Sequence, residues 1–204
     1  MTGNEHFLSE KNTDKNPFNQ FSVWYREAQS IGLTHTDAVV LATSTKEGKP
    51  SARIVLLKSF DDNGFVFFTN YSSRKAKELG ENPFASLLFY WEGLSKQVRI
   101  EGKIEKILKS ESEEYFKTRP RGSRLGAMSS NQSSVIESRE QLEKKYEELD
   151  MKFRDKEIPL PDFWGGYRLI PGSFEFWQSR ENRLHDRILY LKDSGGWKIM
   201  RLAP

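Results

Sequence analysis

The sequence predicts a mainly β protein with flanking helices, of the α+β class, in which an antiparallel sheet closes or nearly closes into a barrel. Two observations lead to this prediction. Short apolar or alternating runs recur between residues 38 and 202, with short turns between most of them and few helical stretches. The chain has 204 residues, 13% of them aromatic, which is enough for one domain with a sizeable core.

The first part of the chain predicts an arm and a helix. Residues 1–16 are polar and rich in turn formers, so we expect a mobile N-terminal arm before a single domain over residues 17–204. Apolar residues then recur at helical spacing from Phe18 to Ala28. Pro17 stands in the first turn, where a helix tolerates proline, and Gly32 follows the end. This pattern predicts an amphipathic helix that covers one end of the sheet.

The next segment predicts a three-stranded antiparallel meander. Its strands are expected at 38–45, 51–60 and 65–70, joined by glycine-containing turns. Residues 72–75 then open a short helix that ends before Pro83. Two more strands are expected at 84–91 and 97–107.

The second half of the chain predicts helices first and strands afterwards. The capping-box pattern at 110–113 predicts a helix that ends at Pro120, and the serine-rich stretch 122–135 predicts a loop. Ser138 with Gln141 predicts the start of a longer, solvated helix that ends near Lys156. Further strands are expected at 163–169, 173–178, 187–191 and 197–202.

Composition excludes several classes of function. With 32 basic and 29 acidic residues, the net charge is +3, and so small an excess argues against nucleic-acid binding. The chain has no cysteine, hence no disulfide, thiolate metal site or cysteine nucleophile, and its three histidines are too few for a metal cluster. Because we find no signal peptide and no apolar run long enough to span a membrane, we expect a soluble, cytoplasmic protein.

Two basic, hydroxyl-rich clusters could each hold a phosphate. In the second cluster, Tyr115 and Arg119 are four residues apart on one helix face, and Ser123 follows the helix end. The first cluster lies at a predicted helix start, and a helix start offers free N–H groups and a partial positive charge to an anion. Each cluster could equally be an ordinary solvated surface. The first cluster, at a helix start, consists of Arg53, Ser72, Ser73, Arg74 and Lys75.

A third basic cluster lies in the stretch from Phe176 to Arg187, which joins two aromatic residues to several ionisable groups. If this stretch continued as a regular strand, alternation would place Arg183, His185 and Arg187 on one face. These groups repel each other unless something anionic or electron-rich lies between them. A solvated basic strand is the alternative. Together with the two phosphate clusters, the stretch indicates a phosphorylated cofactor beside a phosphorylated substrate.

Two sequence fingerprints restrict the kinds of cofactor that the chain is expected to bind. No G-x-G-x-x-G follows a strand, and no G-x-x-x-x-G-K-[ST] occurs in the chain. Their absence disfavours nicotinamide dinucleotides and ATP. An aromatic-lined barrel without glycine-rich loops fits a mononucleotide better.

A series of short motifs runs through the chain. They are SARIVLLK (51–58), FFTN (67–70), SSRK (72–75), NPFASLLFYW (82–91), KQVRIEG (96–102), YF-x-x-RP (115–120), QSS (132–134), FWGGYRL (163–169), EFWQ (175–178), NRLHDR (182–187) and RLAP (201–204). In this order and spacing they resemble the pyridoxamine-phosphate oxidase family, over nearly the whole chain from about Pro17. The resemblance implies a homodimeric, FMN-binding split antiparallel β-barrel with its active sites at the subunit interface.

The resemblance also implies roles for single residues. Lys58, Tyr115, Arg119 and Ser123 would form the substrate-phosphate pocket, and Arg183 and His185 would bind the substrate over its pyridine ring as catalytic groups. Family members often have an N-terminal segment with arginine and tyrosine that can fold over the site. Residues 1–16 contain neither, so closure by this arm does not follow. The implied FMN contacts are Arg53, Ile54, Val55, Leu56, Phe68, Thr69, Arg74, Lys75, Gln97, Gln132, Ser133, Trp177 and Arg187.

The expected activity is therefore a flavin-dependent oxidation in vitamin B6 metabolism. Pyridoxine 5′-phosphate and pyridoxamine 5′-phosphate would be converted to pyridoxal 5′-phosphate, with O₂ as electron acceptor, hydrogen peroxide as product and no metal. A non-catalytic split-barrel carrier of FMN or pyridoxal phosphate is the alternative, against which the second phosphate pocket argues. A nucleic-acid module has only the pI of about 8.9 in its favour. The sequence leaves open the substrate preference and which group, if any, transfers a proton.

Overall fold

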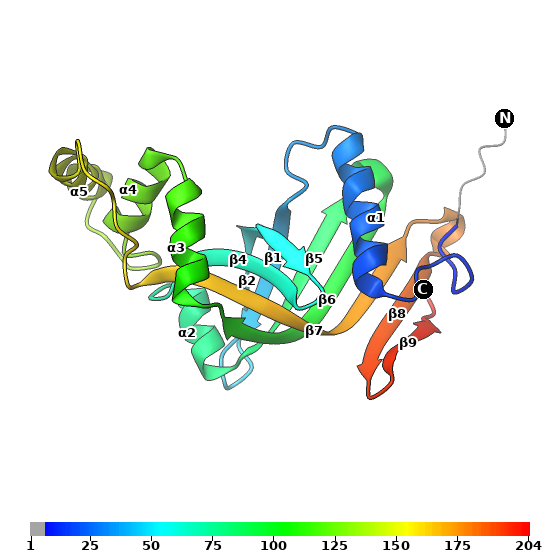
Figure 1. The fold of residues 1–204 in the computed structure, drawn as a ribbon. Coiled ribbons are helices and arrows are strands. Elements are labelled where there is room, and N and C mark those ends of the chain that lie inside the picture. The colour runs from blue at the N-terminus through cyan, green and yellow to red at the C-terminus, as the bar shows by residue number, and fades with distance from the viewer. Residues whose placement is uncertain (1–6) are drawn as a thin grey trace.

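The body of the molecule is one antiparallel sheet of nine strands, seen in a computed structural model that describes residues 7–204 (Figure 1). The strands run in the order β2-β1-β5-β6-β7-β4-β3, and β8 and β9 extend the sheet from β7. Their bounds are β1 Ala38–Ser44, β2 Pro50–Leu56, β3 Ser59–Asp61, β4 Gly64–Asn70, β5 Phe84–Trp91, β6 Lys96–Lys106, β7 Trp164–Gln178, β8 Asp186–Asp193 and β9 Gly196–Arg201.

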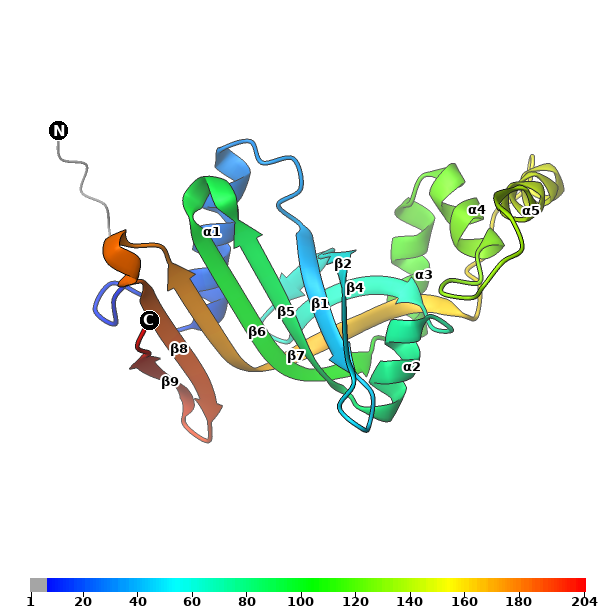
Figure 2. The same cartoon turned by 180° about the vertical axis from the view of Figure 1, so that it is seen from behind.

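The sheet curls, so that β2 and β4 approach each other although they are far apart in the strand order (Figure 2). Just after β2, the backbone N–H of Lys58 donates to the carbonyl of Val66 in β4 at 2.9 Å, and that of Leu57 donates to Asp37 at 2.8 Å. The Lys58–Val66 bond joins the two ends of the curled sheet, and the Leu57–Asp37 bond extends the pairing of β2 with β1. The result is the nearly closed antiparallel barrel that the sequence predicts.

The core fills the inner face of this curl. Inward positions alternate along the strands, as in β1, where Val39 and Leu41 are buried. Helix α1 (Pro17–Ser30), predicted from its apolar spacing, packs its buried face on this core. Phe21 of α1 lies edge to face with Phe65 at 4.9 Å and with Phe89 at 5.1 Å, arrangements that favour aromatic pairs.

Helices α3 (Lys109–Thr118), α4 (Arg121–Ser129) and α5 (Arg139–Lys152) gather at the end of the sheet where β7 begins (Figure 1). A second, smaller core joins them to that strand through Phe116, Leu125 and Trp164. Ser138 caps α5 by accepting from the N–H of Gln141 at 3.3 Å, as predicted. Across residues 7–204, none of the helices is long and apolar enough to cross a membrane.

Two predictions from local pattern are wrong near the helices. Residues 122–135 are not all loop, because α4 occupies the first part and buries Leu125 completely. The cap of α3 is Leu108, whose N–H donates to the Glu111 carboxylate at 3.0 Å, and not Ser110. For α4, burial of an apolar side chain decides the conformation of a polar sequence. Leu108 is 70% exposed, so the α3 cap rests on its hydrogen bond to Glu111 and not on burial.

The predicted strand pairing also differs from the structure. Both hairpins of the predicted meander form, β1 with β2 and β3 with β4, but the run 51–60 is broken into β2 and β3, and β4 also pairs with β7. Strands expected at 163–169 and 173–178 are one strand, β7, with a register shift opposite Gly102. A side chain on Gly102 would clash with the carbonyl of Ile170, so only glycine allows β6 and β7 to approach there.

The predicted mobile arm lies partly on residues 1–6, outside the described residues. Residues 7–16 lie against β7, β8 and β9: the N–H of Leu8 donates to Gln178 at 3.1 Å, and the Tyr190 hydroxyl donates to the carbonyl of Asp14 at 2.6 Å. Arg201 pairs with Glu10 at 3.0 Å. The division into an arm and one domain stays a prediction.

Candidate active site

A pocket of about 530 Å³ opens between β2, β4, the start of α2 (Arg74–Glu81) and the segment from α3 to α4. It brings Lys75 of the first predicted phosphate cluster into one cavity with all three residues of the second. The predicted residues that line it are Ile54, Val55, Leu56, Lys58, Phe68, Thr69, Lys75, Tyr115, Arg119, Ser123 and Gln132.

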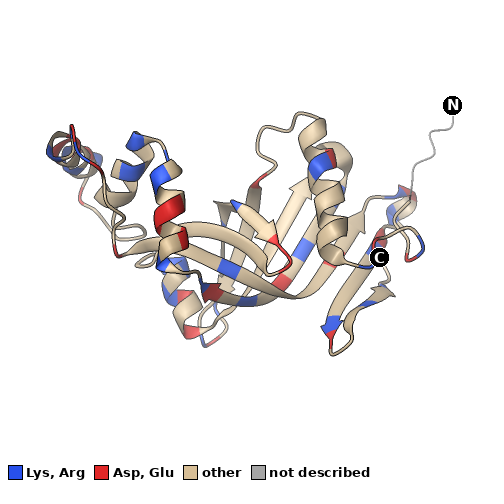
Figure 3. Cartoon of the chain, viewed as in Figure 1, with Lys and Arg blue, Asp and Glu red and all other residues tan. Residues whose placement is uncertain are grey.

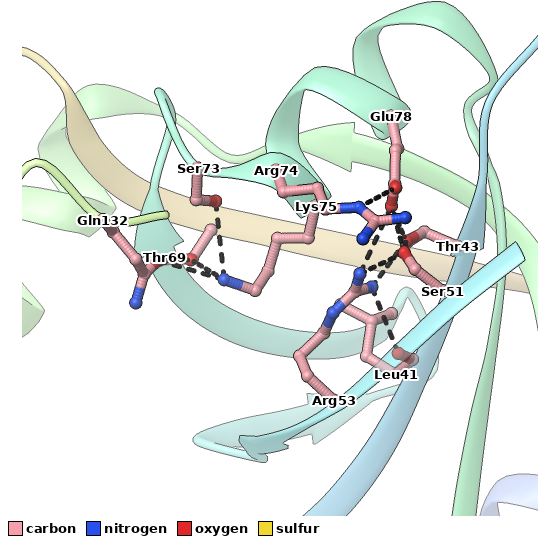
Figure 4. Close-up of polar contacts among 10 residues, drawn as sticks. All are labelled: Leu41, Thr43, Ser51, Arg53, Thr69, Ser73, Arg74, Lys75, Glu78 and Gln132. Atoms are coloured by element: carbon pink, nitrogen blue, oxygen red, sulfur yellow. Dashed lines mark hydrogen bonds and ion pairs between the residues drawn. The ribbon is translucent and has the colours of Figure 1, made fainter. Parts of the chain in front are cut away.

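One end of the pocket contains a buried lysine without an acidic partner among residues 7–204. The Lys75 ammonium donates to the Thr69 hydroxyl at 3.1 Å, to the Gln132 side-chain oxygen at 3.0 Å and to the Ser73 hydroxyl at 3.4 Å, all uncharged groups (Figure 4). Burial, followed by the positive charge of Arg53, lowers the pKa of Lys75 to about 8, against the opposing effect of Glu78. An anion at this end would stabilise the protonated lysine.

Arg53 and Arg74 do not line the cavity but lie next to it, around the carboxylate of Glu78 (Figure 4). Arg74 pairs with Glu78 at 2.8 Å and Arg53 at 3.2 Å. Sequence reasoning missed Glu78. Its position four residues after Arg74 on one helix is the signal that could have found it.

The other end of the pocket is an aromatic stack under a guanidinium. The Phe68 ring stacks with Tyr115, at 4.0 Å between centroids, and with Trp164, at 5.3 Å, and the Tyr115 and Trp164 centroids are 6.2 Å apart. The Arg119 guanidinium carbon lies 4.7 Å from the centroid of the Trp164 ring. The sequence analysis did not single out Trp164, although its motif FWGGYRL was part of the resemblance.

Arg119 is a second cation without an acidic partner in the described part of the chain, and it is half-buried. Its Nη1 atom has no hydrogen-bond partner there, and burial lowers its pKa, against the opposing effect of Tyr115. Buried polar atoms in native proteins are nearly all satisfied, so this Nη1 atom could donate to an acceptor on a ligand in the pocket. Lys58, at the same end, pairs with Asp37 at 3.1 Å, and its side chain is 26% exposed.

The remaining predicted residues lie outside this pocket. Ser133 is in the loop after α4, with a left-handed φ of 71°. The others lie toward the end of β7, in β6 and around β8. Along β7, the chain runs roughly 40 Å from Trp164 to Trp177, at about 3.3 Å per residue. This second group consists of Gln97, Trp177, Arg183, His185 and Arg187.

Residues of the second group make defined contacts with their neighbours. The rings of Trp177 and His185 are 4.7 Å apart, and the backbone N–H of Arg180 donates to His185 Nδ1 at 3.0 Å. Neutral His185 therefore carries its proton on Nε2. Arg187 pairs with Glu175 at 2.8 Å, and the Glu175 side chain is 4% exposed.

The condition under which alternation would place Arg183, His185 and Arg187 on one strand face is not met, because the stretch does not continue as a regular strand. A 3₁₀ turn, η2 (Glu181–Arg183), precedes β8, and Asn182 and Arg183 have φ of 55° and 61°. Left-handed residues break the alternation of a strand. Arg183 thus belongs to a turn and Arg187 to the strand that follows it, and the three residues do not share the face of one regular strand.

Over the rest of the molecule, acidic and basic residues are interspersed with each other. Figure 3 shows acidic and basic residues side by side on α3, α5 and the sheet. The net charge of +3 is therefore not gathered into a broad positive face in this view. This distribution fits local anion sites better than a nucleic-acid surface.

Comparison with known proteins identifies the family. Residues 26–153 match the family model for pyridoxamine 5′-phosphate oxidase, and residues 164–204 match the pyridoxine 5′-phosphate oxidase C-terminal dimerisation region. A pyridoxine/pyridoxamine 5′-phosphate oxidase of Nostoc punctiforme is 57% identical over 97% of this chain and 92% of its own length. One from Rubrobacter xylanophilus is 53% identical over 97% and 91%.

Solved structures agree with the expected fold. PhzG from Burkholderia lata, solved with tetrahydrophenazine-1-carboxylic acid, superposes with a TM-score of 0.92 at 31% identity, over 99% of this chain and 100% of its own. A pyridoxamine 5′-phosphate oxidase-related, FMN-binding protein of Nostoc punctiforme shares the fold, with a TM-score of 0.73 at 18% identity. The expected split-barrel fold is confirmed. The chain belongs to the pyridoxamine 5′-phosphate oxidase family.

Proposed function

We propose that this protein is an FMN-dependent oxidase that converts pyridoxine 5′-phosphate and pyridoxamine 5′-phosphate to pyridoxal 5′-phosphate. O₂ is the electron acceptor and hydrogen peroxide the product. The observation that carries the proposal is a single pocket with two cations, the buried Lys75 and the half-buried Arg119, neither of which pairs with a carboxylate within residues 7–204. Two such cations fit two phosphate groups, one on the cofactor and one on the substrate.

The Lys75 end fits the phosphate of FMN. Lys75, Thr69 and Gln132 line this end, and Arg53 and Arg74 lie beside it. The flavin ring needs an apolar wall, and β2 offers two apolar side chains that the single chain leaves open to solvent: Ile54 is 68% and Leu56 is 42% exposed. When bound, FMN accepts a hydride from the substrate and passes the electrons to O₂.

The Arg119 end fits the phosphate of the substrate. Arg119 Nη1 is free to donate, the Lys58 ammonium adds a second positive charge, and the hydroxyls of Tyr115 and Ser123 line the same wall. The aromatic stack beneath Arg119 keeps the guanidinium from swinging away. This end would bind the substrate and orient it.

The second group of residues would complete the site from a partner subunit. A cofactor bound near Lys75 is too far along β7 for Trp177 and Arg187 of the same chain, whereas a second copy can bring them close. Arg183 and His185 would then cover the pyridine ring, with His185 Nε2 donating a hydrogen bond to it. Residues 164–204 match a dimerisation region, which supports this arrangement.

One experiment tests the reaction class. Purified protein with bound FMN is mixed anaerobically with pyridoxine 5′-phosphate, and the visible flavin absorption is recorded. We expect the yellow band to bleach and to return on admission of O₂. Binding of the substrate without bleaching would instead favour the non-catalytic carrier.

A second experiment tests the shared site. Arg119→Ala and Arg183→Ala subunits, each inactive alone, are mixed under conditions that exchange subunits. If each site combines both chains, mixed dimers contain one intact site, and the mixture regains about one quarter of wild-type activity. No recovery despite proven subunit exchange would place the whole site within one chain.

A further inference from the structure

We propose that Glu78 is a positioning residue for the cofactor phosphate: its carboxylate orients the guanidinium groups of Arg53 and Arg74 and offsets the repulsion among the cations gathered there. The inference rests on the proposed function, because it assumes that this end of the pocket binds the phosphate of FMN. Nothing in the expected chemistry of the family requires an acidic residue beside an anion site, so its presence needs a reason.

The geometry singles out Glu78. Its side chain is only 4% exposed and lies in α2, one turn after Arg74. The hydroxyls of Thr43 in β1 and Ser51 in β2 both donate to Oε2 at 2.5 Å. Arg53 also donates to Oε2, at 3.2 Å, and Arg74 donates to Oε1 at 2.8 Å (Figure 4). One carboxylate thus ties a helix and two strands to both arginines.

The two arginines depend on Glu78 to different degrees. Arg53 Nη1 also donates to the carbonyl of Leu41 at 3.3 Å, so this guanidinium has a second anchor. The Arg74 side chain is 64% exposed, and Glu78 is its ion-pair partner. A long, exposed side chain loses rotamer entropy when it binds a ligand, and a preformed ion pair removes much of that cost in advance.

Glu78 also lowers the net positive charge of the group of cations around it. Arg53, Arg74 and Lys75 with one carboxylate leave a net charge of about +2, which matches a phosphate close to its dianionic form. Burial alone would raise the pKa of Glu78, but hydrogen bonds from Ser51, Thr43, Arg74 and Arg53 lower it to about 2. Glu78 is therefore ionised throughout the neutral range.

The pKa of Lys75 depends on the charges of Arg53 and Glu78. The groups that shift its pKa from outside are Arg53 on β2, which lowers it, and Glu78 on α2, which raises it; Thr69, Ser73 and Gln132 are neutral. Phosphate binds best to protonated lysine, so FMN affinity should be constant below the pKa of free Lys75 and fall above it. Removing the charge of Glu78 moves this fall to lower pH.

The test is titration of apoprotein with FMN, followed by quenching of flavin fluorescence, between pH 6.5 and 9. In wild type we expect the affinity to begin falling near pH 8. In Glu78→Gln, we expect roughly ten- to a hundredfold weaker binding at pH 7, the loss for one hydrogen bond to a charged group. We also expect the fall to begin at lower pH. An unchanged affinity and an unchanged onset in this variant would overturn the proposal.

Two further variants keep the test decisive. Glu81→Gln, at an exposed position in the same helix, removes one carboxylate without touching the arginines and should change neither affinity nor onset. Glu78→Asp keeps the charge but shortens the side chain, so it should keep the onset near pH 8 and still weaken binding. If Glu78→Gln does not fold, wild-type affinity in Glu78→Asp refutes the positioning role.

Failure of this inference can be told apart from failure of the proposed function. Lys75→Met should abolish tight FMN binding if the cofactor phosphate lies at this end of the pocket. Unchanged FMN affinity in Lys75→Met would show that the cofactor site itself is misassigned. Loss of binding in Lys75→Met with no effect of Glu78→Gln would overturn only the role of Glu78.

Discussion

Arg119→Ala is expected to separate recognition of the substrate from binding of the cofactor. The guanidinium lies 4.7 Å from the Trp164 ring, and its Nη1 has no partner in the described residues. Two hydrogen bonds from this group to a phosphate would contribute roughly 1.5–3 kcal/mol each. Because about 1.4 kcal/mol is a factor of ten, losing them should lower kcat/KM for pyridoxine 5′-phosphate on the order of a hundredfold or more.

The assay compares two substrates. Steady-state oxidation of pyridoxine 5′-phosphate and of unphosphorylated pyridoxine is measured on wild type and variant. Wild type should strongly prefer the phosphate ester, whereas the variant should lose most of that preference, since the deleted group has nothing to hold on pyridoxine. FMN content should stay at the wild-type level, because Lys75 and its partners are untouched.

Arg121→Ala is the matched control. Arg121 lies two residues further along, but its guanidinium pairs with Asp150 of α5 and does not line the pocket. Its loss should leave the preference between the two substrates unchanged. Equal losses on both substrates in Arg119→Ala, or a wild type that oxidises pyridoxine as well as its phosphate, would refute the assignment of this pocket end.

Two more predictions concern the other charged groups. Arg187→Ala should weaken FMN binding as well as turnover, because it removes a cation that Glu175 holds at 2.8 Å; FMN titration of the apoprotein checks this, and an unchanged dissociation constant would mean that Arg187 does not contact the cofactor. The pKa of Glu78 is about 2 in the folded protein against an ordinary 4.5, so its contribution to stability is present above pH 4.5 and is lost as the pH falls toward 2. This contribution is at most about 3 kcal/mol. Urea unfolding of wild type and Glu78→Gln between pH 6 and 3 should show the wild-type advantage shrinking; a constant difference in the free energy of unfolding would contradict it.

The sequence by itself determined the elements whose signals are local. The apolar spacing and Pro17 marked α1, the hairpin of β1 and β2 followed from two β-branched runs with a short turn, and Ser138 marked the start of α5. The same holds for the members of the substrate-phosphate cluster, since Tyr115 and Arg119 are neighbours on one helix face. In each case the residues that decide the structure are within a few positions of each other.

Tertiary structure alone decided how these parts are joined. Strand β4 pairs with β7, about a hundred positions away, and the helix α4 forms in a polar stretch because Leu125 is buried. The left-handed turn at Asn182 and Arg183 separates Arg183 from the strand that contains Arg187, which alternation along the sequence could not show. Glu78 meets Thr43, Ser51 and Arg53 only because the sheet curls. Contacts between distant segments depend on sheet order and on burial, and no local pattern of residues encodes either.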